Sequence, residues 1–187
     1  MITFEKKGIE NTTTTLQLAL EEATKRNLDI CMATTMGASA KQMMEMAKLA
    51  NFKNKIVVVS HAYGFRTPGE NTLSDELRKE LEDYGITVVT ASHVLSGAER
   101  GLGNKYQGVY PVQIIADSLR MLSQGVKVCV EIAVMALDAG KLPYGKEVLC
   151  IGGTGRGQDT ICIVTPSHAN HILDTKINEI IAKPYNP

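Results

Sequence analysis

Two kinds of apolar pattern alternate along the first three quarters of the chain. Short runs of apolar, often β-branched residues occupy positions 28–33, 55–59 and 86–89, which predicts buried strands. Between them and after them, apolar residues recur every three or four positions, which predicts amphipathic helices. The predicted helices cover residues 12–26, 40–50, 73–84, 111–122 and 126–139.

Local signals mark where several of these helices begin and end. Asn27 can close the first helix because asparagine tolerates the left-handed conformation found at helix ends. Thr72 and Asp75 have the spacing of a capping box, and Gly85 follows the helix that this box would begin. Pro111 stands where a first helical residue is expected.

The last part of the chain has a different pattern. Residues 147–151 and 161–165 predict two strands joined by a nine-residue turn, and residues 174–182 predict a short helical stretch. The glycine-punctuated segment 91–108 predicts a long loop with one short helix. Strand and helix alternate before the closing strand pair. This pattern predicts a three-layer α/β/α sandwich with a mostly parallel sheet and an antiparallel last strand.

Composition narrows the functional classes. A chain of 187 residues suits one domain, residues 1–187, and its 20 basic and 20 acidic side chains provide no global attraction for nucleic acid or membrane. No apolar run reaches the length of a membrane span, and the first residues lack a signal-peptide core, so we expect a soluble cytoplasmic protein. The four cysteines are widely spaced within apolar runs, which predicts buried thiols and no metal site.

The turn at residues 152–160 is a candidate anion-binding loop. It contains four glycines, which let backbone N–H groups approach a ligand, and Arg156, which can form a bidentate bond with a phosphate. The alternative is a flexible turn with a solvated arginine. The residues proposed to bind are Gly153, Thr154, Gly155, Arg156, Gly157, Asp159 and Thr160.

A second candidate loop follows the first predicted strand. Residues 34–39 combine hydroxyl groups, a glycine and the start of a helix, where free N–H groups favour an anion. The loop matches neither the Walker motif nor the Rossmann fingerprint, and ordinary turn and capping chemistry is the alternative. The residues proposed to bind are Thr34, Thr35, Met36, Gly37 and Ser39.

Polar residues also follow the second and third predicted strands. Ser60 and His61 end one strand, and Ser92 and His93 follow the next. Adjacent side chains on a strand point to opposite faces, so neither pair is a ready-made catalytic dyad. We expect a ring nitrogen to bond a ligand or a loop, with Ser60, His61 and the nearby Gly64 as candidate binding residues. Catalysis by His61 or His93 is the alternative.

Charged residues elsewhere have simpler interpretations. Glu131 lies four residues after Lys127, which favours an ion pair on a solvated helical stripe, with a carboxylate reaching into the site as the alternative. Glu99 and Arg100 are expected to be solvated, although a lid would need such groups. His168 and His171 are expected on the surface.

Together these segments resemble a known family. Residues 10–12, 33–40, 127–140 and 152–160 are similar to a group of small stand-alone proteins related to the C-terminal α/β domain of pyruvate kinase. The resemblance implies a mixed five-stranded sheet with the order 3-2-1-4-5 and strand 5 antiparallel. The catalytic barrel of pyruvate kinase is absent, so phosphotransfer to ADP is not implied, and residues 91–108 lie outside the kinase pattern.

The resemblance also implies a ligand site. The kinase domain binds a sugar-bisphosphate effector, with a phosphate at the loop that matches residues 34–39 and a glycine-rich cover that matches residues 152–160. Flavin mononucleotide (FMN) is the ligand implied for the stand-alone family. Its reaction is undefined.

Three hypotheses follow for the function. The first is a protein that binds a phosphate-bearing small molecule, FMN before others, between the two loops. The second is a small hydrolase or oxidoreductase that uses His61 or His93 as an acid or base. The third is a homo-oligomer that senses a sugar phosphate, with apolar helix faces in its interface.

Overall fold

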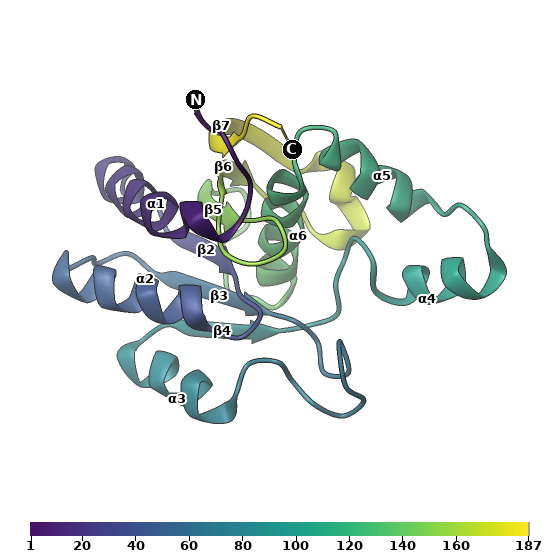
Figure 1. Cartoon of the computed structure of the whole chain (residues 1–187), viewed down its shortest axis with the longest axis horizontal. Helices are drawn as coiled ribbons and strands as arrows, with labels where there is room; N and C mark the ends of the chain where they lie inside the picture. The colour runs from purple at the N-terminus through teal and green to yellow at the C-terminus, as the bar shows by residue number, and fades with distance from the viewer. Residues whose placement is uncertain (187) are drawn as a thin grey trace.

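A computed structural model describes residues 1–186, which form an α/β fold around one seven-stranded sheet (Figure 1). The sheet has the order β1-β7-β6-β5-β2-β3-β4. In chain order the strands are β1 (Ile2–Phe4), β2 (Ile30–Ala33), β3 (Ile56–Ser60), β4 (Thr87–Thr90), β5 (Val148–Gly152), β6 (Thr160–Thr165) and β7 (Lys176–Pro184).

Five adjacent strands, from β4 at one edge to β6, follow the predicted order and direction. β4, β3, β2 and β5 are parallel, and β6 is antiparallel to β5, with Cys150 of β5 opposite Cys162 of β6. Parallel strands covered on both faces should be almost wholly apolar, and every residue of β3 and β5 is buried. The prediction of a mixed, mostly parallel sheet is therefore confirmed.

Two further strands extend the sheet at the β6 edge. The predicted helical stretch at residues 174–182 is wrong, because β7 pairs with β6 in antiparallel register and β1 adds to β7 in parallel. Ile177, Ile180 and Ile181 of β7 have a helix-like spacing, but irregularities in the β6–β7 register let this spacing fit a strand. A short 3₁₀ helix, η2 (Ala169–Asp174), precedes β7.

Helices cover both faces of the sheet, as predicted. Helices α1 (Thr12–Arg26), α2 (Ala38–Leu49) and α3 (Asp75–Tyr84) share a core with the side chains of Ile30 and Met32. Helix α6 (Gln124–Asp138) packs on the other face, where its core includes Cys31 from the same strand. The alternation of side chains along β2 thus separates the two cores and gives the three layers.

Most helix ends match the sequence signals, but the start of α3 does not. Asn27 has a φ of 55° at the end of α1, and Pro111 begins α5 (Pro111–Arg120). The capping residue of α3 is Ser74, whose hydroxyl accepts the Leu77 N–H, so the predicted capping box of Thr72 and Asp75 is wrong. The Thr72 hydroxyl instead donates to the Thr35 carbonyl at 2.7 Å and ties the α3 segment to the loop after β2.

The remaining segments lie at the ends of the sheet. Residues 91–110 contain α4 (Gly97–Tyr106), which agrees with the predicted loop with one short helix. A short 3₁₀ helix, η1 (Ile9–Asn11), precedes α1. The four cysteines are free and buried, as expected. Within residues 1–186 no helix is long and apolar enough to cross a membrane, and no three acidic, histidine or cysteine side chains could hold a metal.

Candidate functional site

The loop after β2 presents the uncapped start of α2. The Thr34 hydroxyl accepts the Gly37 N–H at 3.1 Å, and Gly37, at the capping position of α2, makes no side-chain capping bond. Gly37 has a φ of 91°, and a Cβ there would lie 2.2 Å from a methyl carbon of Leu77 on α3. The positive φ favours glycine here, and any Cβ would also displace the Leu77 side chain, so the start of α2 packs closely against α3.

The turn at residues 152–160, which we call the glycine turn, packs against the N-terminal segment of the chain. Gly157 has a φ of 84°, and a Cβ there would lie 2.5 Å from the Cα of Ile9 in η1. The Gly8 N–H donates to the Asp159 carboxylate at 2.9 Å, and the Thr160 hydroxyl donates to the same carboxylate at 2.8 Å. Asp159 and Thr160 are buried, and in this structure both side chains bond within the chain.

The exposed tip of the turn differs from its buried base. Arg156 is exposed and has no hydrogen bond or ion pair with residues 1–186. Thr154 is half-buried, and its hydroxyl oxygen finds no partner among the same residues. The turn thus has one guanidinium and one hydroxyl that form no hydrogen bond with the described residues.

Gln158 joins the two predicted loops, and the sequence analysis missed it. Its side-chain nitrogen donates to the Ala33 carbonyl at 2.7 Å and to the Ser39 hydroxyl at 3.2 Å, and its N–H donates to the Thr12 hydroxyl at 3.1 Å. Gln158 is only 3% exposed, and its carbonyl oxygen Oε1 has no partner within the described chain. No local pattern in the sequence distinguishes this glutamine from a solvated turn residue.

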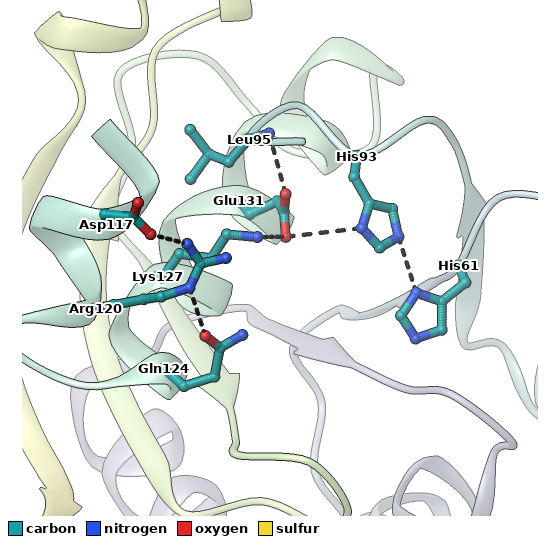
Figure 2. Close-up of polar contacts among 8 residues, drawn as sticks. All are labelled: His61, His93, Leu95, Asp117, Arg120, Gln124, Lys127 and Glu131. Atoms are coloured by element: carbon teal, nitrogen blue, oxygen red, sulfur yellow. Dashed lines mark hydrogen bonds and ion pairs between the residues drawn. The ribbon is translucent and has the colours of Figure 1, made fainter. Parts of the chain in front are cut away.

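A chain of hydrogen bonds runs from the loop after β2 across the ends of β3 and β4. Thr35 Oγ1 lies 3.1 Å from His61 Nε2, and His61 Nδ1 lies 2.9 Å from His93 Nε2. His93 Nδ1 lies 4.0 Å from the Glu131 carboxylate. Figure 2 shows the part of this chain from His61 to Glu131. We refer to Thr35, His61, His93 and Glu131 as the histidine relay.

Helix α6 anchors the far end of the histidine relay. Glu131 pairs with Lys127, one turn earlier on α6, and accepts the Leu95 N–H at 3.0 Å (Figure 2). The predicted ion pair is present, but the predicted solvated stripe is wrong, because both side chains are about 5% exposed. Since α6 packs across the sheet, Glu131 instead faces the histidines.

The surroundings keep the histidines neutral near pH 7. Burial, followed by the charge of His93, lowers the pKa of His61 to about 4, and burial lowers the pKa of His93. Burial also lowers the pKa of Lys127. Neutral histidines carry one proton each, so each ring has one donor and one acceptor nitrogen.

The charge of Glu131 then sets the direction of the protons. At 4.0 Å the Glu131 carboxylate is beyond hydrogen-bond distance of His93 Nδ1, but its negative charge favours a proton on that nitrogen. In that tautomer His93 Nε2 accepts from His61 Nδ1. His61 Nε2 is left as an acceptor for the Thr35 hydroxyl. Thr35 therefore donates into the chain and presents oxygen lone pairs to any ligand beside it.

An aromatic stack borders the histidine relay. The Phe65 ring lies parallel to the His61 ring, with centroids 3.8 Å apart, and 43% of Phe65 is exposed. Gly64, in the same turn, is exposed, and its N–H donates a hydrogen bond to the Glu70 carbonyl. Ser60 is buried, and its hydroxyl forms a hydrogen bond with the Thr90 hydroxyl.

The structure brings part of the predicted site together. Gln158 holds Ser39 and the carboxyl end of β2, and Thr35 connects this region to His61. Met36 is exposed beside these residues in the chain. The contact between His61 and His93 had an available sequence signal, because β3 and β4 are parallel neighbours with Ser60 opposite Thr90. His168 and His171 are exposed, as expected.

Comparison with protein families identifies a family for most of the chain. The family model described as pyruvate kinase, alpha/beta domain, matches residues 13–164. The matched region extends from α1 to β6 and includes residues 34–39, 152–160 and the histidine relay. Strands β1 and β7 lie outside it.

Proposed function

Because this chain belongs to the pyruvate kinase alpha/beta domain family, we propose that it binds a phosphate-bearing small molecule, with FMN as the first candidate. The phosphate would lie at the start of α2, between residues 34–39 and the glycine turn. The ligand position that the resemblance implies for the family is the same.

The bridge made by Gln158 is the observation that carries this proposal. Its two side-chain bonds, to Ala33 and Ser39, hold the base of the glycine turn against the loop that begins α2. The two segments, each of which favours an anion, are therefore joined side by side. An anion there would meet the N–H groups of the first turn of α2, which no side chain caps.

Other groups suit the rest of a nucleotide-like ligand. Arg156 supplies an exposed guanidinium without a partner among residues 1–186, which could bond a phosphate. The exposed Phe65 ring offers a flat apolar surface near His61 for a ring system such as isoalloxazine. The Thr35 hydroxyl can accept a hydrogen bond from a ligand hydroxyl or amide group.

A comparison of FMN with riboflavin tests the proposal. Riboflavin has the same ring and side chain but no phosphate, so it is the matched control ligand. In a fluorescence titration we expect FMN to bind at least tenfold more tightly than riboflavin. Equal affinity for the two, or no binding of FMN, would exclude the proposed phosphate seat.

Acid–base catalysis is a second candidate function, and the histidine relay favours it. A hydroxyl and two neutral imidazoles in a hydrogen-bonded series, with a buried carboxylate 4.0 Å from the second ring, can move a proton toward or away from a bound ligand. A base with a pKa of about 4 is weak at neutral pH, so this function requires a ligand that raises the pKa of His61. Turnover that survives both His61→Ala and His93→Ala would exclude it.

A sugar-phosphate-sensing homo-oligomer is a third candidate. Helix α5 and the residues on either side of it expose large apolar side chains, which are Val109, Ile114, Met121 and Leu122. Apolar surface of this kind is common at interfaces between subunits. Light scattering with and without fructose 1,6-bisphosphate tests the idea, since a monomer under both conditions would rule it out.

A further inference from the structure

A separate cavity lies between α4 and α5, away from the proposed phosphate site. Its volume is about 390 Å³, within the range of sites for small ligands. Its lining includes Glu99 and Arg100 of α4 and Arg120 at the end of α5. No residue of the loops 34–39 or 152–160 lines it.

Glu99 lines this cavity, and one of its carboxylate oxygens has no hydrogen-bond partner among residues 1–186. One carboxylate oxygen, Oε1, accepts the Val112 N–H of α5 at 3.3 Å, which fixes the side chain. The other oxygen, Oε2, is buried and has no hydrogen-bond partner within residues 1–186. A buried carboxylate oxygen without a donor is costly, so a shift of the Glu99 side chain toward an occupant that brings an N–H group or a cation would be favourable.

Positive charge lies in the lining of the same cavity. Arg100 follows Glu99 directly in the chain, yet its side chain forms no hydrogen bond or ion pair with residues 1–186. Arg120 is held by Asp117 and by Gln124, which fix its guanidinium through Nη1 and Nε (Figure 2). The lining thus contains an unsatisfied acceptor and guanidinium groups that are not paired with it.

We propose that this cavity binds a small amino-acid-like molecule that carries an ammonium group and at least one acidic group. The ammonium group bonds the Glu99 carboxylate after its side chain shifts toward the cavity, and the acidic group bonds Arg100, with Arg120 as a further partner. The polar amides of Asn104, Gln107 and Gln113 line the cavity as well and can bond the rest of the molecule. A lone metal ion would satisfy Glu99 but would leave the arginines without a role.

The cavity also reaches the histidine relay through one residue. Leu95 lines the cavity, and its backbone N–H holds the Glu131 carboxylate that faces His93. An occupant therefore packs against the segment that positions Glu131. Binding in this cavity should therefore affect the surroundings of Glu131 and His93 even when FMN is absent.

Calorimetry with three probes tests the proposal on the full chain. The probes are O-phosphoethanolamine, L-aspartate and L-glutamate, and the matched controls are ethanolamine and ethyl phosphate, which each lack one charge. We expect at least one probe to bind and to raise the melting temperature, and neither control to do so. If none of the three probes binds at millimolar concentration, the proposal is wrong.

Three variants locate the binding. Glu99→Gln keeps the acceptor for Val112, and Arg100→Gln alters an exposed side chain, so both should fold. Each should weaken probe binding by about ten- to a hundredfold, the factor expected for a lost bond between charged groups. Lys105→Gln, on the same helix but outside the lining, should leave it unchanged.

Two results would overturn the assignment. Probe binding that is equal in wild type and Glu99→Gln would exclude the ammonium contact. Stabilisation by Mg²⁺ or Ca²⁺ alone that depends on Glu99 but not on Arg100 would show a cation site instead. FMN affinity, measured in the same variants, should stay unchanged, which separates this proposal from the function proposed above.

Discussion

His61 Nδ1 lies 2.9 Å from His93 Nε2, and this bond joins residues that follow two neighbouring parallel strands. The two rings are neutral because burial is the first cause that lowers the pKa of each. The pair therefore acts as a fixed hydrogen-bonded unit near pH 7. Its behaviour on acidification is a direct test of this arrangement.

Acid should destabilise the fold through His61. An unfolded histidine takes up its proton near pH 6.5, whereas the folded pKa is about 4, so the unfolded state binds more protons between these values. The stability contributed by neutral His61 is complete above pH 6.5 and is lost as the pH falls toward 4. Partial exposure reduces the full linkage, and we expect a loss of roughly 2 kcal/mol.

Urea unfolding at pH 7, 5.5 and 4.5 measures this loss. The His61→Asn variant cannot titrate in this window, so its stability should change less with pH than that of the wild type. The exposed His171→Asn variant is the matched control and should follow the wild type. Parallel curves for wild type and His61→Asn would contradict the assigned role of His61.

Gln158→Leu should weaken both stability and ligand binding. The substitution keeps the approximate shape but removes the donor that satisfies the Ala33 carbonyl and the Ser39 hydroxyl, at a cost of about 1 to 3 kcal/mol. FMN affinity should fall as well, because the glycine turn loses its link to α2. Gln17→Leu, on the exposed face of α1, is the control. A stability loss with unchanged FMN affinity would limit Gln158 to a structural role.

Arg156→Ala should affect binding without affecting stability. The side chain is exposed and has no partner among residues 1–186, so unfolding should change by less than about 0.5 kcal/mol. Loss of a charge-assisted bond to phosphate should weaken FMN binding by about 1.5 to 3 kcal/mol. Riboflavin binding should not change, and Lys79→Ala provides an exposed control. Unchanged FMN affinity would leave the turn as a simple connection.

Glu131→Gln should be strongly destabilising. It leaves Lys127 buried without its carboxylate, which we expect to cost about 3 kcal/mol, near the lower end for a broken buried ion pair. Glu22→Gln removes an ion pair with Arg26 at the same helical spacing on the surface, and it should cost less than about 1 kcal/mol. Chemical denaturation of both variants gives the comparison.

A double variant separates the ion pair from other effects of Glu131→Gln. Adding Lys127→Met removes the stranded charge, so the double variant should be more stable than Glu131→Gln alone. A double variant that loses the sum of both single losses would indicate that Lys127 and Glu131 act independently.

The strands β2 to β6 and their helices could be predicted because the local pattern of apolar residues in each segment indicates which of its faces is buried. The residues of β3 are apolar on both faces, and α1 carries its apolar residues on one stripe, so local pattern and final position agree. β7 could not be predicted in this way. It is half-exposed, and its isoleucines suit a helix as well as a strand until β6 is placed beside it.

The site was predictable only to the level of its loops. The start of α2 and the glycine turn each have a local composition that suits an anion. The bonds of Gln158 depend instead on which segments meet in space, whereas the contact of His61 with His93 follows from the parallel pairing of β3 and β4. Glu131 shows the same limit, since its spacing from Lys127 revealed the ion pair but not the burial that brings it to the histidines.

The side chain of Gln158 connects segments that are far apart in the sequence and are therefore synthesised at different times. Its bonds to Ala33 and Ser39 span 125 and 119 residues, so the first loop is synthesised long before its partner. A contact of such separation closes a long loop, and the entropy cost of that closure is offset only when the intervening chain is folded. A ligand held by both loops can therefore bind only the finished fold, and its binding should serve as a reporter that synthesis and folding are complete.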